Sequence, residues 1–174
     1  MKILIWDNDG TVTGSTTPND PTKVILPNVA ATMKNADFNF IISGFKSPES
    51  EMQNFDSEKI AARFAELMIK LPINAAAFSP AIGGVECHVI VKTDEGMHHI
   101  KAHEDSRYED FIGKFKKPEI GMFVVMQDIA QEFFGADIMG ATMIGDTWHD
   151  KDAAEEFGIE FCWASKIHEG SFTK

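Results

Sequence analysis

Residues 2–12, Lys-Ile-Leu-Ile-Trp-Asp-Asn-Asp-Gly-Thr-Val, decide the fold expected for this chain. The run from Lys2 to Trp6 is short, apolar and rich in isoleucine, and it stops at an acidic turn that contains a glycine. This pattern is typical of a strand buried on both faces. The two aspartates, Asp7 and Asp9, therefore follow directly on the carboxyl end of a core strand.

The remaining sequence alternates between strand and helix patterns with short connections. Apolar runs at 38–42, 73–78, 141–144 and 159–164 predict further strands, and helical spacing of apolar residues predicts helices at 27–36, 60–68, 118–133 and 150–157. Such alternation predicts an α/β fold, a parallel sheet flanked by helices. With 174 residues, of which 44% are hydrophobic, we expect one domain over residues 1–174.

Residues 83–115 break the alternation. Val85 to Val91 alternates in polarity, residues 93–96 have turn chemistry, and Met97 to Ile100 can return as a second strand. We expect a self-contained hairpin that acts as a small cap or flap and governs substrate choice through its tip. An ordinary solvated hairpin is the alternative.

The polar residues that follow the apolar runs have metal-binding and phosphate-binding chemistry. They are Asp7, Asp9, Ser43, Asp146 and Asp150, and Lys117 opens a predicted helix. The carboxyl ends of parallel strands meet at one edge of the sheet, where ligands bind. Carboxylates gathered there repel one another by about 4 kcal/mol per pair at 4 Å, and a hard cation such as Mg²⁺ removes that cost. The same edge would suit a phosphate dianion.

Four motifs in this order resemble those of the haloacid dehalogenase (HAD) superfamily. Residues 7–11 are similar to its D-x-D-G-T signature, and Ser43 ends the second strand. Lys117 stands in Lys-Pro-Glu-Ile-Gly-Met, and residues 145–150 match G-D-x-x-x-D. The resemblance runs from residue 7 to residue 150 and implies a Rossmann-like HAD fold and a phosphatase.

The resemblance also implies a role for each motif residue. Asp7 would be the nucleophile that forms an aspartyl-phosphate, and Asp9 the general acid and base. Asp7, the Asp9 carbonyl, Asp146 and Asp150 would hold Mg²⁺, with Asp150 acting through water or the lysine. Ser43, Gly44 and Lys117 would bind the phosphate. Lys116 is the alternative to Lys117.

The Lys-Pro-x-x-Gly-Met pattern resembles one branch of the superfamily, which holds histidinol-phosphate, heptose-bisphosphate and polynucleotide 3′-phosphatases. It places Pro118 at the first position of a helix. The chain has Ser43-Gly44-Phe45 where the first two groups often carry Thr-Asn-Gln, and it has no Cys/His zinc loop of their kind. The phage-type polynucleotide phosphatases place Arg where Phe45 stands. The substrate class therefore stays open between a sugar or other metabolite phosphate and a nucleotide or polynucleotide phosphate.

Charge and cysteine content limit the kinds of substrate and the cellular compartment that we expect. A formal charge of −11 disfavours a polynucleotide end, although it does not exclude one. Cys87 and Cys162 are too few for a disulfide framework, and the sequence has no apolar run long enough to span a membrane, so we expect a cytoplasmic protein. The sequence does not determine the oligomeric state.

Two further alternatives concern a second metal and a different class of function. His98, His99 and His103, with Cys87 and His88, raise the question of zinc, but their spacing matches no standard site, and a polar hairpin face is our interpretation.

A receiver-like signalling domain or another non-hydrolytic phosphate-binding module would gather similar residues at its site. A receiver places its phosphorylated Asp after the third strand, where this chain has Phe78-Ser79-Pro80.

Overall fold

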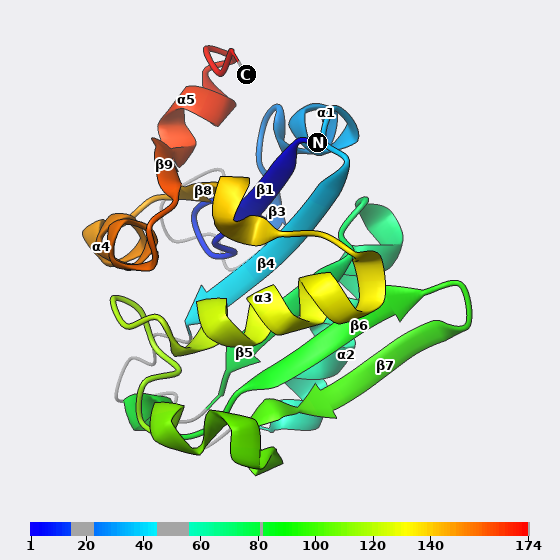
Figure 1. Ribbon diagram of the computed structural model, residues 1–174. Helices are drawn as coiled ribbons and strands as arrows, with labels where there is room; N and C mark the ends of the chain where they lie inside the picture. Colours follow the sequence, from blue (N-terminus) through cyan, green and yellow to red (C-terminus); the bar gives the residue numbers. More distant parts are fainter. Residues whose placement is uncertain (15–22, 45–55, 81, 174) are drawn as a thin grey trace.

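A seven-stranded sheet organises the chain in a computed structural model that describes residues 1–14, 23–44, 56–80 and 82–173 (Figure 1). The strand order is β7-β6-β5-β4-β1-β8-β9. The strands are β1 (Ile3–Trp6), β4 (Phe38–Gly44), β5 (Ala75–Ser79), β6 (His88–Thr93), β7 (Gly96–Lys101), β8 (Thr142–Gly145) and β9 (Glu160–Trp163). Five of them, β5, β4, β1, β8 and β9, run parallel, whereas β6 and β7 are antiparallel. The predicted α/β fold is confirmed, with a mixed rather than wholly parallel sheet.

Helices cover both faces of the sheet, as continuous apolar strands require. On one face lie α3 (Gly121–Phe134) and α4 (Trp148–Phe157), and on the other lie α1 (Val29–Lys34), α2 (Ser57–Lys70) and α5 (Ala164–His168). Alternate residues of β1 supply the two cores: Ile3 and Ile5 pack toward α3, and Leu4 and Trp6 toward α2. All four side chains are buried, since β1 lies inside the sheet between β4 and β8 and is covered on both faces.

Two helix starts bear on the functional site. Helix α2 is capped by Asp56, whose side chain accepts a hydrogen bond from the backbone N–H of Glu58. Helix α3 begins at Gly121, so the prediction that Pro118 occupies its first position is wrong. Residues before it form a tight turn instead, in which the Glu119 N–H donates to the Lys116 carbonyl and the Gly121 N–H to the Lys114 carbonyl.

The hairpin of β6 and β7 is not self-contained, which corrects the prediction. Strand β6 pairs with β5 and extends the central sheet, and Val89 and Val91 are buried in the core beneath α3. An isolated two-stranded hairpin is marginally stable, and this one gains a third strand and a covered face.

The hairpin tip also points away from the carboxyl edge of the parallel strands. Phe78, the penultimate residue of β5, pairs with His88 at the start of β6, whereas the tip turn at 93–96 lies beyond the Ala75–Val91 pair, at the opposite edge of the sheet (Figure 1). The tip therefore does not lie over the phosphate pocket as predicted, whereas a role of residues 83–115 in substrate choice stays a prediction. The segments next to the carboxyl edge are the two ends of the insertion, around residues 82–88 and 101–116.

Smaller elements complete the described part of the chain. They are the two-stranded ribbon of β2 (Thr13–Gly14) and β3 (Val24–Ile25), and the 3₁₀ turns η2 (Ile82–Gly84), η3 (Ala102–Glu104), η4 (Ser106–Phe111) and η5 (Ile138–Gly140). Among the described helices, none combines the length and apolar character needed to cross a membrane.

Candidate active site

Asp7 is the first residue after β1 and lies at the centre of the site. Its backbone N–H donates to the Ile144 carbonyl at 2.9 Å, which continues the pairing of β1 with β8 past the end of the strand. Its side chain is buried, with 7% of the residue exposed. Burial raises the pKa of Asp7 to about 6, although the neighbouring Lys117 ammonium lowers it. Asp7 is thus a carboxylate held in a dry position by backbone pairing.

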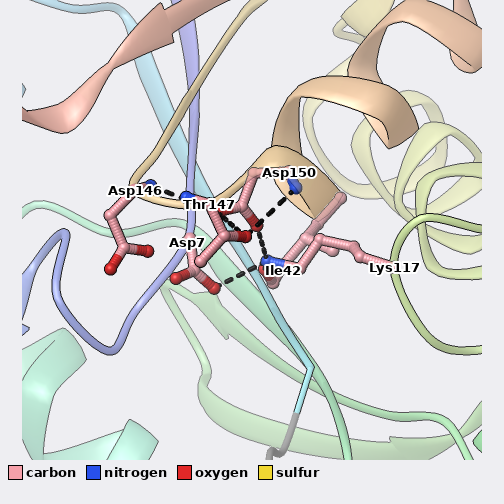
Figure 2. A network of polar contacts seen from close by, with 6 residues as sticks. All are labelled: Asp7, Ile42, Lys117, Asp146, Thr147 and Asp150. Carbon is pink, nitrogen blue, oxygen red and sulfur yellow. Dashed lines mark hydrogen bonds and ion pairs between the residues drawn. The ribbon is translucent and has the colours of Figure 1, made fainter.

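Lys117 reaches the same position from the loop before α3. Its Nζ donates to Asp7 Oδ1 at 2.6 Å and to the Ile42 carbonyl at 3.1 Å, and it forms an ion pair with Asp150 (Figure 2). Only 6% of its side chain is exposed. Burial by itself lowers the pKa of Lys117, but the charges of Asp7 and Asp150 outweigh it and the pKa is raised. The lysine is a permanent cation between two buried carboxylates.

Asp150 is held by the first turn of α4. Its Oδ2 accepts from the Thr147 N–H at 3.0 Å, the Thr147 hydroxyl at 2.9 Å and the Asp146 N–H at 3.1 Å. With the Thr147 side chain as N-cap, this is a capping box. The other oxygen, Oδ1, faces Lys117. Both oxygens of Asp150 are therefore engaged, and the residue positions Lys117 and the loop of Asp146.

Asp146 follows β8 and is the solvent-exposed member of the group. One ligand atom from each of Asp7, Asp146 and Asp150 can be chosen so that all lie within 4.8 Å of one another. The donors are oxygens alone, the chemistry that a hard divalent cation prefers. The three carboxylates come from two strand ends and a helix, so only the parallel pairing of β1 with β8 brings them together.

Asp9 and Ser43 lie to one side of this group. Asp9 is half-exposed and forms an ion pair with Lys23. Ser43, the penultimate residue of β4, is 2% exposed. Both border a cavity of about 270 Å³ whose other lining residues are Asn8, Thr13, Lys23, Ile60, Arg63, Phe64, Glu66, Leu67 and Lys70. Gly44 ends the same strand, and a Cβ built on it would lie 3.8 Å from Lys117 Cε. The predicted phosphate residues thus lie between the carboxylates and a cavity with basic side chains.

The turn after β1 depends on a glycine at Gly10. Its φ is +80°, and a Cβ placed there would come within 2.2 Å of Asp146 Oδ2. We expect Gly10→Ala to displace Asp146 and to lower the free energy of unfolding by more than about 1 kcal/mol, since both the left-handed backbone and the contact oppose a side chain. Denaturant unfolding would measure this. Gly140→Ala is the matched control, because a Cβ there meets nothing within 4 Å; equal losses in the two variants would contradict the expectation.

The structure separates the two candidate lysines and adds residues that the sequence reasoning missed. Lys116 is exposed, whereas the Lys117 side chain is buried among the carboxylates. The missed groups are the Ile42 carbonyl, Thr147 and Lys23. The role of Thr147 could have been predicted from the sequence, because Thr-Trp-His-Asp at 147–150 is a capping-box pattern. The role of a backbone carbonyl cannot, because every residue has one. Phe45 lies outside the described residues.

Fold and site together define an α/β protein with an acidic, lysine-containing centre at the carboxyl edge of its sheet. Its structure is similar to a protein of Mesorhizobium loti described as a HAD-like phosphatase, with 17% identity and a TM-score of 0.53, covering 91% of this chain and 69% of that one. It is also similar to D,D-heptose 1,7-bisphosphate phosphatase from B. bronchiseptica in complex with magnesium and phosphate, with 19% identity and a TM-score of 0.53, covering 92% and 79%. No protein-family model and no curated protein matches the sequence. At these identities the similarity establishes the fold, and the expected Rossmann-like HAD fold is confirmed.

Proposed function

We propose that this protein is a Mg²⁺-dependent phosphomonoester hydrolase that works through an aspartyl-phosphate on Asp7. The observation that carries the proposal is the buried Asp7 carboxylate in contact with Lys117, with an Asp146 oxygen close enough to share one cation. Perturbed titratable groups gathered in this way are typical of catalytic sites. The fold shared with HAD-like phosphatases is consistent with it.

The residues fit a magnesium ion. Asp7, Asp146 and the Asp9 carbonyl oxygen would hold it, whereas Asp150 would act through Lys117, since both its oxygens already accept hydrogen bonds or ion pairs. When bound, Mg²⁺ supplies positive charge that offsets the repulsion among carboxylates and phosphate oxygens. Lys117 and the Ser43 hydroxyl would neutralise and orient the remaining phosphate oxygens.

The reaction divides into two displacements at phosphorus. A carboxylate oxygen of Asp7 attacks phosphorus while the ester P–O bond breaks, and Asp9 transfers its proton to the departing alcohol oxygen. Water then attacks the aspartyl-phosphate, giving a proton to Asp9 as its oxygen bonds to phosphorus. The bond between phosphorus and the Asp7 oxygen breaks, and inorganic phosphate and the starting enzyme remain.

The leaving group would occupy the cavity beside Asp9 and Ser43. At about 270 Å³ it suits a small molecule, and its lining includes Lys23, Arg63 and the ring of Phe64. These side chains support a sugar or other metabolite phosphate, or a nucleotide, as substrate. A polynucleotide end is the less favoured alternative, because the chain carries a net charge of −11.

A phosphatase screen tests the function as a whole. The panel contains sugar phosphates, nucleotides and 3′- or 5′-phosphorylated oligonucleotides, each with Mg²⁺ and with EDTA. We expect Mg²⁺-dependent release of inorganic phosphate from at least one member. A receiver-like or non-hydrolytic phosphate-binding module, the alternative, would release none while still binding phosphate or Mg²⁺. No Asp follows β5, the third of the parallel strands along the chain, where a receiver carries its phosphorylated residue.

Replacing Asp9 tests its role as general acid. Asp9→Asn is expected to slow alkyl phosphate hydrolysis by on the order of 10²–10⁴-fold, because the alkoxide leaves poorly without a proton. Nitrophenyl phosphate, whose leaving group needs no proton, should lose far less in the formation of the aspartyl-phosphate. Single-turnover rates for the two substrates measure the difference. Asp152→Asn, which makes the same change of charge on the exposed surface of α4, is the control and should hydrolyse both substrates at the wild-type rate. Equal losses for both substrates in Asp9→Asn would contradict the role.

A further inference from the structure

Three histidines and a glutamate gather at the base of the β6–β7 hairpin, apart from the acidic site. His88 opens β6 and is 2% exposed, and its ring stacks on Phe78. The rings of His99 and His103 lie 5.1 and 4.9 Å from that of His88. Interpreting these residues as a polar hairpin face is therefore wrong for His88, because the pairing of β6 with β5 buries it.

Glu86, His88 and His103 can offer one ligand atom each within 4.8 Å of one another. His88 Nε2 faces Glu86 Oε2 at 2.9 Å. Ligand atoms on one tetrahedral zinc ion lie about 3.4 Å apart, because each bond is about 2.1 Å long. The three ligand atoms thus lie near the spacing of a shared ion, and Glu86, whose side chain is 40% exposed, has room to adjust.

The second nitrogen of each ring already has a partner that orients it. His88 Nδ1 lies 2.9 Å from His99 Nε2, and His103 Nδ1 lies 3.0 Å from the Cys87 carbonyl oxygen and 3.2 Å from its nitrogen. In the tautomer that donates from Nδ1 to the carbonyl, His103 Nε2 carries a free lone pair. Metal-binding histidines are almost always held in this way through the nitrogen that does not bind the metal.

We propose that Glu86, His88 and His103 form a binding site for a transition-metal ion, with zinc as the best match. Two imidazoles and one carboxylate favour such ions over Mg²⁺, and three protein ligands leave a fourth position for water or another ligand. A metal there ties the start of β6 to η3, the two ends of the insertion beside the carboxyl edge of the sheet. The site does not depend on the proposed phosphatase function.

Cobalt and zinc titrations of the full-length protein test the site. Co²⁺ absorbs visible light much more strongly in a tetrahedral site than in an octahedral one, so its spectrum reports this site rather than the carboxylate group. In excess Mg²⁺, we expect one tetrahedral Co²⁺ per chain, displaced by Zn²⁺, and a melting temperature raised by Zn²⁺. Asp146→Asn, which removes an acidic-site carboxylate, should leave both signals unchanged.

Two ligand variants and one matched control decide the assignment. Glu86→Gln and His103→Ala, both at partly exposed positions that tolerate change, should each weaken Co²⁺ and Zn²⁺ binding at least about tenfold. His98→Ala is the control: His98 lies on the same hairpin, but it is exposed and bonds to Thr93. It should bind both metals like the wild type. Wild-type affinity in both ligand variants, absence of a tetrahedral spectrum, or loss of the spectrum in Asp146→Asn would overturn the proposal.

Discussion

Asp7→Asn is expected to abolish phosphate release while leaving the fold intact. The substitution is nearly isosteric, but it removes the oxygen proposed to attack phosphorus and the negative charge that faces Lys117. Removing a catalytic nucleophile from a hydrolase costs on the order of 10⁴–10⁶-fold in kcat. Steady-state hydrolysis of a nitrophenyl phosphate in Mg²⁺ would measure the loss, and mass spectrometry of the quenched wild-type enzyme would show a phosphate adduct on Asp7.

Asp152→Asn is the control, because it makes the same change in charge at a residue on the exposed surface of α4. It should retain wild-type turnover and the same phosphate adduct. Asp7→Asn should keep the wild-type circular dichroism spectrum and cooperative unfolding. Turnover within tenfold of wild type in a folded Asp7→Asn protein would contradict the covalent mechanism, even if Mg²⁺ dependence remained.

Lys117→Met is expected to have the second large effect, on stability as well as turnover. The lysine is the cation between the buried carboxylates of Asp7 and Asp150, and methionine fills similar space without charge. Removing one partner of a buried ion pair typically costs about 3–5 kcal/mol, because a buried charge is left without compensation. Denaturant unfolding at pH 8 without Mg²⁺ would measure the loss.

The loss should shrink as the pH falls. Burial already raises the pKa of Asp7 to about 6, and removing the Lys117 charge raises it further. A carboxyl group with a raised folded-state pKa binds a proton more tightly in the folded protein, so its contribution to stability is lost as pH rises through that pKa. The variant is therefore expected to approach wild-type stability near pH 5. Lys116→Met, at the exposed neighbour, should change stability by less than about 0.5 kcal/mol at either pH; a comparable loss there would contradict the assignment to the buried pair.

The strand-end positions in the sequence were enough to predict that Asp7 and Asp146 would meet. Ile3–Trp6 is a short apolar run, and Thr142–Gly145 is apolar apart from Thr142, so both strands are expected to be buried on both faces. Parallel strands with short crossovers place their carboxyl ends at one edge, so Asp7 and Asp146 come together. The choice of Lys117 over Lys116 rested on resemblance, and the position of its Nζ now supports it.

Features that depend on side-chain geometry or on non-local pairing could not be predicted in the same way. The alternating residues of β6 fit a free hairpin as well as a strand added to the sheet. What decides is that the edge of β5 has backbone N–H and C=O groups left to pair, and β6 pairs with them. The start of α3 at Gly121 depends on a turn closed by backbone hydrogen bonds, which any residue type can make. Asp150 was predicted as a metal ligand, but one of its oxygens accepts the hydrogen bonds of the capping box with Thr147. The sequence does not show how these hydrogen bonds divide the two oxygens.

The sequence by itself therefore determined the α/β fold and the edge of the sheet at which the acidic residues and the lysine gather. Local apolar periodicity and the geometry of parallel strands are sufficient for the fold and for the meeting of Asp7 with Asp146, whereas the choice of the lysine rested on the resemblance of its motif. Only the tertiary structure decided the direction of the hairpin, the separation of Asp9 from the buried carboxylates and the meeting of Glu86 with His88 and His103. Those features depend on contacts between residues far apart in the chain or on the rotation of single side chains, and neither leaves a periodic signal in the sequence.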